Sequence, residues 1–355
     1  MALANKNALR NTDDEGTRFN YWTKLPLVVK ILILKLMTLS DQIALSSLSK
    51  QCQELIRPIP IHMRVMCVRH VGSDEPRLFS IDEEKNPCLC EVEDIWSRLT
   101  LSKSTIYRFI LGIRAAEYEN VIFKNFLSKI KKFSHQENSI KTKFLVWNLN
   151  ENNMEFVEQL MPYFDPSSLE ELRFHGTFNQ RVYEYISSTI QWEVCKNLFV
   201  SMENVAIEEA PIIDISKFIH FDQLVIEVNK TNRNSIRRLI ENFASGRHPI
   251  GSNFFIGCFN GIPISDVLPQ REGLPEYSKF FVFPHNVIGH DDWVLAVSVG
   301  RRHVQAMICE RDGWEDRYGG DCWIPRFCQS RVAMYMENIH LPSVSDGPVA
   351  YYNFD

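Results

Sequence analysis

The side chains best suited to chemistry are cysteines, histidines and acids near the carboxyl end of the chain. They are His285, His290, Asp291 and Asp292, followed by Cys309, Asp312, Glu315, Asp316, Cys322 and Cys328. A zinc site needs about four such ligands at close spacing, and a cysteine nucleophile needs a base brought beside it by the fold. Neither the group from His285 to Asp292 nor the group from Cys309 to Cys328 has a recognised ligand spacing. We therefore interpret the first group as a polar turn between strands.

A second candidate is Cys88-x-Cys90, which lacks a second pair at zinc spacing and is interpreted as a loop. The chain has no dinucleotide or phosphate-binding glycine loop, serine nucleophile elbow or H-E-x-x-H helix. We therefore predict no catalytic residue, no metal and no cofactor. An enzyme sited in residues 261–355 is the alternative, and it would require a polar pocket with convergent titratable groups there.

The composition is typical of a globular protein, and the cysteines are expected to be free thiols. Hydrophobic residues make up 45% and charged residues 23% of its 355 residues, and the net charge is -5. This balance argues against a general nucleic-acid binder. The nine cysteines are scattered, and the first 18 residues are polar, which is unlike a disulfide framework or a secretory signal. The most apolar stretch, Leu25 to Met37, is too short to span a bilayer. We expect a soluble intracellular protein, cytoplasmic or nuclear.

The strongest structural signal lies between residues 22 and 56. Leu25-Pro26 favours a helix start, because a proline in the first turn gives up no needed N–H donor. The next residues, Leu27 to Met37, are apolar on nearly every side of a helix, and such a helix must be covered on more than one side. A second helix is predicted from Ser40-Asp41 to Pro58, with an apolar face of Leu45, Leu48, Cys52 and Leu55. This apolar excess favours a partner; a hairpin packed only on its own domain is the alternative.

Residues 141 to 260 repeat a short apolar strand. The strands are centred on Leu145, Leu172, Leu198 and Leu224, at steps of 27, 26 and 26 residues, with a looser copy at Phe254-Phe255-Ile256. Helical patterns lie between them, and a unit of one strand and one helix buries its apolar face only by stacking on neighbours. We predict a mixed α/β fold with an irregular leucine-rich-repeat-like αβ solenoid, its strands forming one parallel sheet in sequence order. Ordinary α/β packing with coincidental spacing is the alternative.

The remaining segments complete the expected organisation. Residues 1–18 are predicted to be a flexible leader, 19–60 the helical module, and 61–140 a mixed connecting segment with a helix at Ser104 to Ala116. Residues 261–355 are predicted to form a strand-rich cap or appended domain, with strands at Lys279 to Phe283 and Trp293 to Val299.

The helical module resembles an F-box. Leu25-Pro26 matches the opening Leu-Pro, Ile33-Leu34 the Ile-Leu pair, Asp41 to Leu45 the middle stretch, and Ser47 to Lys50 the closing element. Ser47 and Leu48 depart from the commoner valine-cysteine or valine-serine core. The resemblance implies docking on a Skp-family adaptor of a cullin ubiquitin ligase. The implied docking residues, some of which must belong to the module's own core, are Leu25, Pro26, Ile33, Leu34, Ile43 and Leu48.

The repeat region resembles the FTH domain of nematode F-box proteins. The matching stretches are Met161 to Pro166, Leu169 to Leu172, Ile190 to Trp192 ahead of Cys195-Lys196, and Phe218 to Phe221. The order of the two domains implies a non-catalytic substrate-recognition subunit of an SCF-type E3 ubiquitin ligase, with side chains such as Arg173 and Glu227 facing an unknown protein target. A protein- or RNA-binding repeat scaffold without a ligase role is the alternative. Only the F-box interpretation requires the hairpin to leave an apolar patch unburied.

Overall fold

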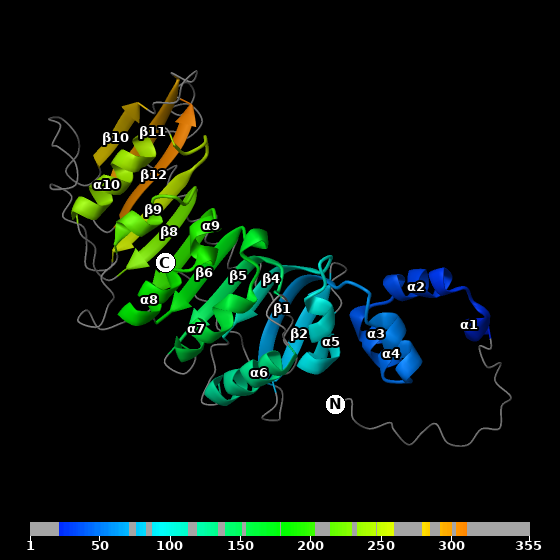
Figure 1. The fold of residues 1–355 in the computed structure, drawn as a ribbon. Coiled ribbons are helices and arrows are strands. Elements are labelled where there is room, and N and C mark those ends of the chain that lie inside the picture. The colour runs from blue at the N-terminus through cyan, green and yellow to red at the C-terminus, as the bar shows by residue number, and fades with distance from the viewer. Residues whose placement is uncertain are drawn as a thin grey trace.

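The computed structural model describes residues 21–70, 76–82, 87–112, 119–133, 139–150, 154–177, 179–202, 214–228, 233–245, 247–258, 279–284, 292–299 and 303–310. Within these residues, a helical unit at the N-terminal end leads into one large β-sheet. The remaining helices lie on a single face of that sheet (Figure 1).

Twelve strands of the described chain form the sheet, in the order β10-β11-β12-β9-β8-β7-β6-β5-β4-β1-β2-β3. Their bounds are β1 His62–His70, β2 Pro76–Asp82, β3 Pro87–Glu91, β4 Thr105–Leu111, β5 Thr142–Leu149, β6 Glu171–Gly176, β7 Asn197–Met202, β8 Gln223–Val228, β9 Asn253–Cys258, β10 Lys279–Pro284, β11 Trp293–Val299 and β12 His303–Glu310. Neighbours from β1 through β4 to β9 are parallel, and antiparallel strands extend the sheet at both ends.

The repeated strands lie side by side, with their leucines in register. Leu145 pairs with Leu172, Leu172 with Leu198, and Leu198 with Leu224. Phe254, in the looser fifth copy, pairs with Leu224. The prediction of one parallel sheet in sequence order is therefore confirmed.

The helices cover the face of the sheet to which this leucine row points. Their bounds are α5 Val92–Leu99, α6 Glu119–Phe133, α7 Val157–Leu160, α8 Gln180–Ile186, α9 Ile190–Val194 and α10 Arg233–Ala244, with short 3₁₀ helices η1 Met154–Phe156, η2 Met161–Tyr163, η3 Pro166–Ser168 and η4 Ile215–Phe218. Parallel strands are joined by right-handed crossovers, and the order from β4 to β9 never reverses, so every crossover returns on the same face. Helix and strand side chains form one continuous apolar core there.

The N-terminal unit has more helices than predicted. It comprises α1 Tyr21–Lys24, α2 Leu27–Leu36, α3 Leu39–Ser46 and α4 Lys50–Ile56. The prediction of one continuous second helix is wrong, because this segment forms two helices, α3 and α4. Ser49 is the N-cap of α4, and its Oγ accepts a hydrogen bond from the Cys52 N–H at 3.1 Å. Leu48 consequently lies in the break between α3 and α4.

The predicted helix at Ser104 to Ala116 is also wrong, since residues Thr105–Leu111 form β4. Ile106, Phe109 and Leu111 are buried in the core between β1 and β5. Most side chains of β4 are buried, so the strand has a nearly continuous apolar run, and a short run of this kind also fits helical spacing.

The C-terminal strands continue the same sheet. The two strands predicted near Lys279 and Trp293 are present as β10 and β11, and β12 joins them to β9 in antiparallel pairing. Residues 311–355 lie outside the described residues. Among the helices described, none has the length and apolar content needed to cross a bilayer.

Candidate docking surface

The outward side of α2 carries an apolar surface. Val28, Leu32 and Leu36 are 68%, 55% and 88% exposed, and they recur at the four-residue spacing that places side chains on one helix face. Leu27 and Val29 of the same helix are also exposed. Single exposed leucines are ordinary, but a group of this size on one short helix marks an interaction site.

The opposite side of α2 is used for the unit's own core. Leu34 packs with Ile56 and Ile59, and all three are buried. Partly buried side chains surround them, namely Trp22, Met37, Leu45 and Leu55. This small cluster covers one side of α2 only, which is why a helix that is apolar all round leaves the other side in water.

The six predicted docking residues fall into different environments. Pro26, Ile33 and Leu48 are exposed, Leu25 and Ile43 are partly buried, and Leu34 is buried. Ile43 packs against the main sheet core. The exposed Leu27, Val28, Leu32 and Leu36 were not predicted. A helical projection of residues 27–37 with Leu34 placed inward would have found Val28, Leu32 and Leu36.

The face of the sheet opposite the helices carries no helix within the described part of the chain (Figure 1). An in-register row crosses it, formed by Val146, Arg173, Phe199, Val225 and Phe255. Arg173 does not offer its charge outward as expected, because it is only 3% exposed and forms an ion pair with Glu171 on the same strand.

Glu227 lies on the same helix-free face and is partly buried. Its carboxylate accepts a hydrogen bond from Ser201 Oγ at 2.6 Å. The Phe199 ring tilts against the His175 ring with 5.0 Å between centroids, and Phe255 stacks on His303 at 5.9 Å. The face therefore combines aromatic side chains with polar groups.

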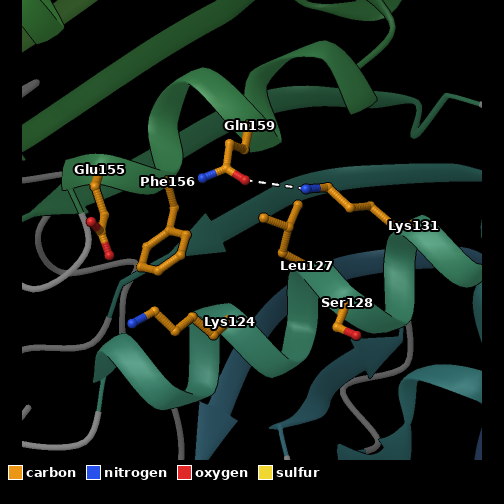
Figure 2. A pocket seen from close by; sticks show the side chains of 7 residues that line it. All are labelled: Lys124, Leu127, Ser128, Lys131, Glu155, Phe156 and Gln159. Atoms are coloured by element: carbon orange, nitrogen blue, oxygen red, sulfur yellow. Dashed lines mark hydrogen bonds between the residues drawn. The ribbon is translucent and has the colours of Figure 1, made fainter.

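A groove of about 460 Å³ opens on the helical side, between α6 and the η1–α7 segment (Figure 2). Phe156 and Leu127 form its apolar floor. Figure 2 shows Glu155 and Lys124 at one end, while at the other Lys131 Nζ donates to Gln159 Oε1 at 3.2 Å. Its lining holds no histidine or cysteine.

Two domain families match the segments that carry these features. The F-box domain matches residues 22–63, and the FTH domain matches residues 124–265. The chain contains both domains. No curated protein and no solved structure matches it. The F-box domain implies binding to a Skp-type adaptor and indicates an adaptor role of the SCF type, with the FTH domain as the substrate-binding part.

The match to the F-box domain covers α2 to α4 and the exposed apolar surface. The match to the FTH domain begins at Lys124 within α6, earlier than the expected residue 141, and runs through β5 to β9. It includes the groove and much of the helix-free face.

Two of the described cysteines, Cys195 and Cys309, are poorly suited to nucleophilic chemistry. Burial raises the pKa of the Cys195 thiol in the FTH domain to about 12, and it raises the pKa of the Cys309 thiol on β12 to about 11. Both stay protonated at neutral pH, whereas the thiolate is the nucleophile. Cys88 and Cys90 lie in β3 and are buried, so the predicted loop there is wrong.

No group of three or more metal-binding side chains is found where the structure is described. Asp292 is exposed. The other residues considered as ligands or catalytic partners lie outside the described ranges, namely His285, His290, Asp291, Asp312, Glu315, Asp316, Cys322 and Cys328.

Proposed function

We propose that this chain is the substrate-recognition subunit of an SCF-type E3 ubiquitin ligase. Its F-box domain binds a Skp-family adaptor, which joins it to a cullin and a RING-bound conjugating enzyme. The FTH domain holds a protein target. The observation that carries the proposal is the apolar surface of α2, exposed on a segment that matches the F-box domain.

The adaptor covers the outward side of α2. Val28, Leu32 and Leu36 supply the central apolar contacts, with Leu25, Pro26, Ile33, Ile43 and Leu48 around them, and Leu34 supports the helix from beneath. Burying one such side chain completely stabilises a complex by about 1.5–3 kcal/mol. A few well-packed apolar anchors are enough to dominate an interface of this kind.

The proposed mechanism is proximity and needs no catalytic residue in this chain. Holding a target lysine near an activated ubiquitin converts an encounter between separate molecules into a reaction within one assembly. The chain's contribution is then the affinity of two surfaces and the geometry between them. Such a subunit works inside the cell, in the cytoplasm or the nucleus.

The target binds on the helix-free face of the sheet. The repeated units act as a short αβ solenoid, whose strands present a regular array of side chains, including Phe199, Val225 and Glu227. Partly exposed aromatic rings beside a carboxylate suit a protein ligand that brings apolar side chains and a basic group. A protein- or RNA-binding scaffold without a ligase role would use the same face but not the surface of α2.

A matched pair of substitutions tests the adaptor contact. Leu32 in the F-box domain is 55% exposed and Ile190 in the FTH domain is 56% exposed, so changing either to alanine removes a similar amount of exposed apolar surface. We expect Leu32→Ala to weaken binding of a purified Skp adaptor about tenfold, or ~1.4 kcal/mol, in calorimetry, while Ile190→Ala leaves it unchanged. If the unmodified chain fails to bind the adaptor, the scaffold function replaces the ligase function.

A further inference from the structure

A buried arginine joins the F-box domain to the sheet. Arg98 on α5 is 2% exposed, and its Nε donates to the Ile59 carbonyl oxygen at 3.0 Å. Its Nη2 donates to Oε1 of Gln42 on α3, which is itself buried. Ile59 and Gln42 lie within the F-box match, whereas Arg98 does not.

Gln42 carries this connection to the docking helix. Its Nε2 donates to the Leu34 carbonyl at 2.7 Å and to the Met37 carbonyl at 3.0 Å, at the C-terminal end of α2. The chain of contacts therefore runs from α5, through Arg98 and Gln42, to the backbone of α2. A second connection is made by Ser104, whose Oγ accepts from the Ile61 N–H at 2.9 Å and donates to the Arg98 carbonyl.

The apolar contact at this junction is small. From α2 to α4, Leu39 is buried in the main core and Ile43 packs partly against it, while Leu34, Ile56 and Ile59 form a separate cluster. Apolar contact is not directional, so two side chains of this kind leave the angle between the parts loosely defined. Hydrogen bonds are directional, and buried ones are costly to leave unmade.

The chemistry of both side chains suits a fixed connection. A guanidinium presents several N–H donors in a rigid plane, so one Arg98 side chain reaches two acceptors at a set angle. Gln42 accepts with its oxygen and donates twice with its nitrogen. Burial lowers the pKa of Arg98 to about 10, so the guanidinium keeps its proton and its donors at neutral pH.

We propose that Arg98 and Gln42 are positioning residues that hold the docking helix α2 at one orientation relative to the sheet. This inference rests on the proposed function, because the benefit of a fixed orientation is that a target on the sheet faces the ligase in a defined way. Both side chains are buried in the free chain, at 2% and 6% exposed, so they act through the orientation of α2 and not through direct contact with a partner.

The orientation is measured in the free full-length chain. Spin labels are placed by Lys35→Cys on α2 and Ser128→Cys on α6, both exposed positions, in a background with Cys52, Cys322 and Cys328 changed to serine. Electron–electron resonance then gives the distribution of distances between the two labels. We expect a single narrow distribution for the parent chain. A broad parent distribution would overturn the proposal before any further variant is made.

Variants separate the connection from general stability. Arg98→Met removes both contacts of the guanidinium and should broaden the distribution, while Arg98→Lys should broaden it less because the amine still reaches one acceptor. Arg98→Met alone leaves the buried Gln42 Oε1 without its donor. The double variant Arg98→Met/Gln42→Met removes that oxygen as well, and it is measured instead if Arg98→Met does not fold. Arg57→Met, at an exposed arginine of the F-box domain, is the control and should leave the distribution narrow.

Ligase assays keep the two proposals distinguishable. Arg98→Met leaves the bonds from Gln42 to α2 in place, so adaptor affinity should change by less than about twofold. The set of this chain's own lysines that receive ubiquitin in the reconstituted ligase should widen, which a merely stabilising role would not cause. Absence of adaptor binding by the parent chain would defeat the proposed function alone. A distribution as narrow in folded Arg98→Met as in the parent would defeat the positioning role alone.

Discussion

Leu34 and Leu36 stand two positions apart on α2 but have different surroundings. Leu34 is fully buried under α4, and Leu36 is the most exposed of the large hydrophobic side chains described, at 88%. Deleting a buried leucine removes transfer energy and leaves a cavity, whereas deleting an exposed one removes only a contact that a partner would make. On the proposed function, stability and docking therefore depend on different residues of one helix.

Gly176 ends β6 at a position where no side chain fits. Its φ is 96°, and a Cβ there would lie 2.1 Å from the Leu149 carbonyl oxygen on β5. Gly251 has a similar φ of 86° but open space around it. We expect Gly176→Ala to lower the free energy of unfolding by more than about 3 kcal/mol and Gly251→Ala by about 1 kcal/mol, measured by urea denaturation. Equal losses would show that backbone strain alone governs both sites.

At the level of elements, the sequence predicts the repeated strands but misses features that depend on how neighbouring elements pack. The spacing of Leu145, Leu172, Leu198 and Leu224 predicted parallel strands side by side in sequence order, because stacked units of one strand and one helix have nearly equal lengths. β4 was missed, since Ile106 and Phe109 fit a helix as well as a covered strand. The exposed side of α2 could not be assigned without knowing which side α4 covers. The resemblances to the F-box and FTH domains could be found from the sequence, because they depend on residues close together in the chain. A target-binding surface could not, because it depends on how strands far apart in the sequence align.

Two adjacent glutamates at the start of β6 form ion pairs that differ in burial. Glu171 is buried and pairs with buried Arg173, whereas Glu170 and Lys143 are about half exposed and pair at 2.7 Å. Removing one partner of a buried pair leaves an uncompensated charge, so Glu171→Gln should cost about 3–5 kcal/mol of unfolding free energy. Glu170→Gln should change little, because water screens an exposed pair. Denaturant titration of both variants checks this. A Glu170→Gln loss as large as that of Glu171→Gln would contradict it.

A half-buried histidine, His220, makes an acid-sensitive contact between α9 and the segment that leads into β8. His220 Nε2 donates to the Trp192 carbonyl at 2.8 Å, and burial lowers the pKa of its imidazole below the ordinary 6.5. As pH falls below about 6.5, the unfolded chain takes up a proton that the folded chain does not, so stability decreases on acidification until the lower folded pKa is reached. His303 contributes to the pH dependence of stability in the same direction, since burial lowers the pKa of its imidazole.

The measurement is the urea midpoint between pH 7.5 and 5.5, a range set around the ordinary pKa. The midpoint should fall with pH in the parent chain and fall less in His220→Gln, which keeps an amide donor for Trp192 but does not titrate. A midpoint that rises on acidification, or the same pH dependence in both chains, would contradict the assignment.

Across the described part of the molecule, the F-box domain has an apolar cluster that is separate from the main core of the sheet and much smaller than it. The sheet and its helices form a continuous cluster that runs from Leu39 to Ile308, while the F-box domain has a separate cluster around Leu34, Ile56 and Ile59. Burial of apolar surface is the main favourable term in folding, so a small core is the less stable part. The docking helices are therefore expected to open locally while the sheet stays folded.

Hydrogen exchange measures this difference and its response to a partner. Amides of α2 to α4 should exchange faster than those of β5 to β9 in the free chain, because local opening of the small core exposes them without global unfolding. Adding a Skp adaptor at about 100 times its Kd should slow exchange in α2 to α4 by up to ~100-fold, since binding stabilises the closed form by about 2.7 kcal/mol. Strands β5 to β9 should keep their rates, because they open only with the whole domain and lie away from the adaptor. Slowing spread evenly over both parts would mean that the two cores open as one unit. Slowing confined to the sheet would place the adaptor elsewhere and remove α2 as its binding site.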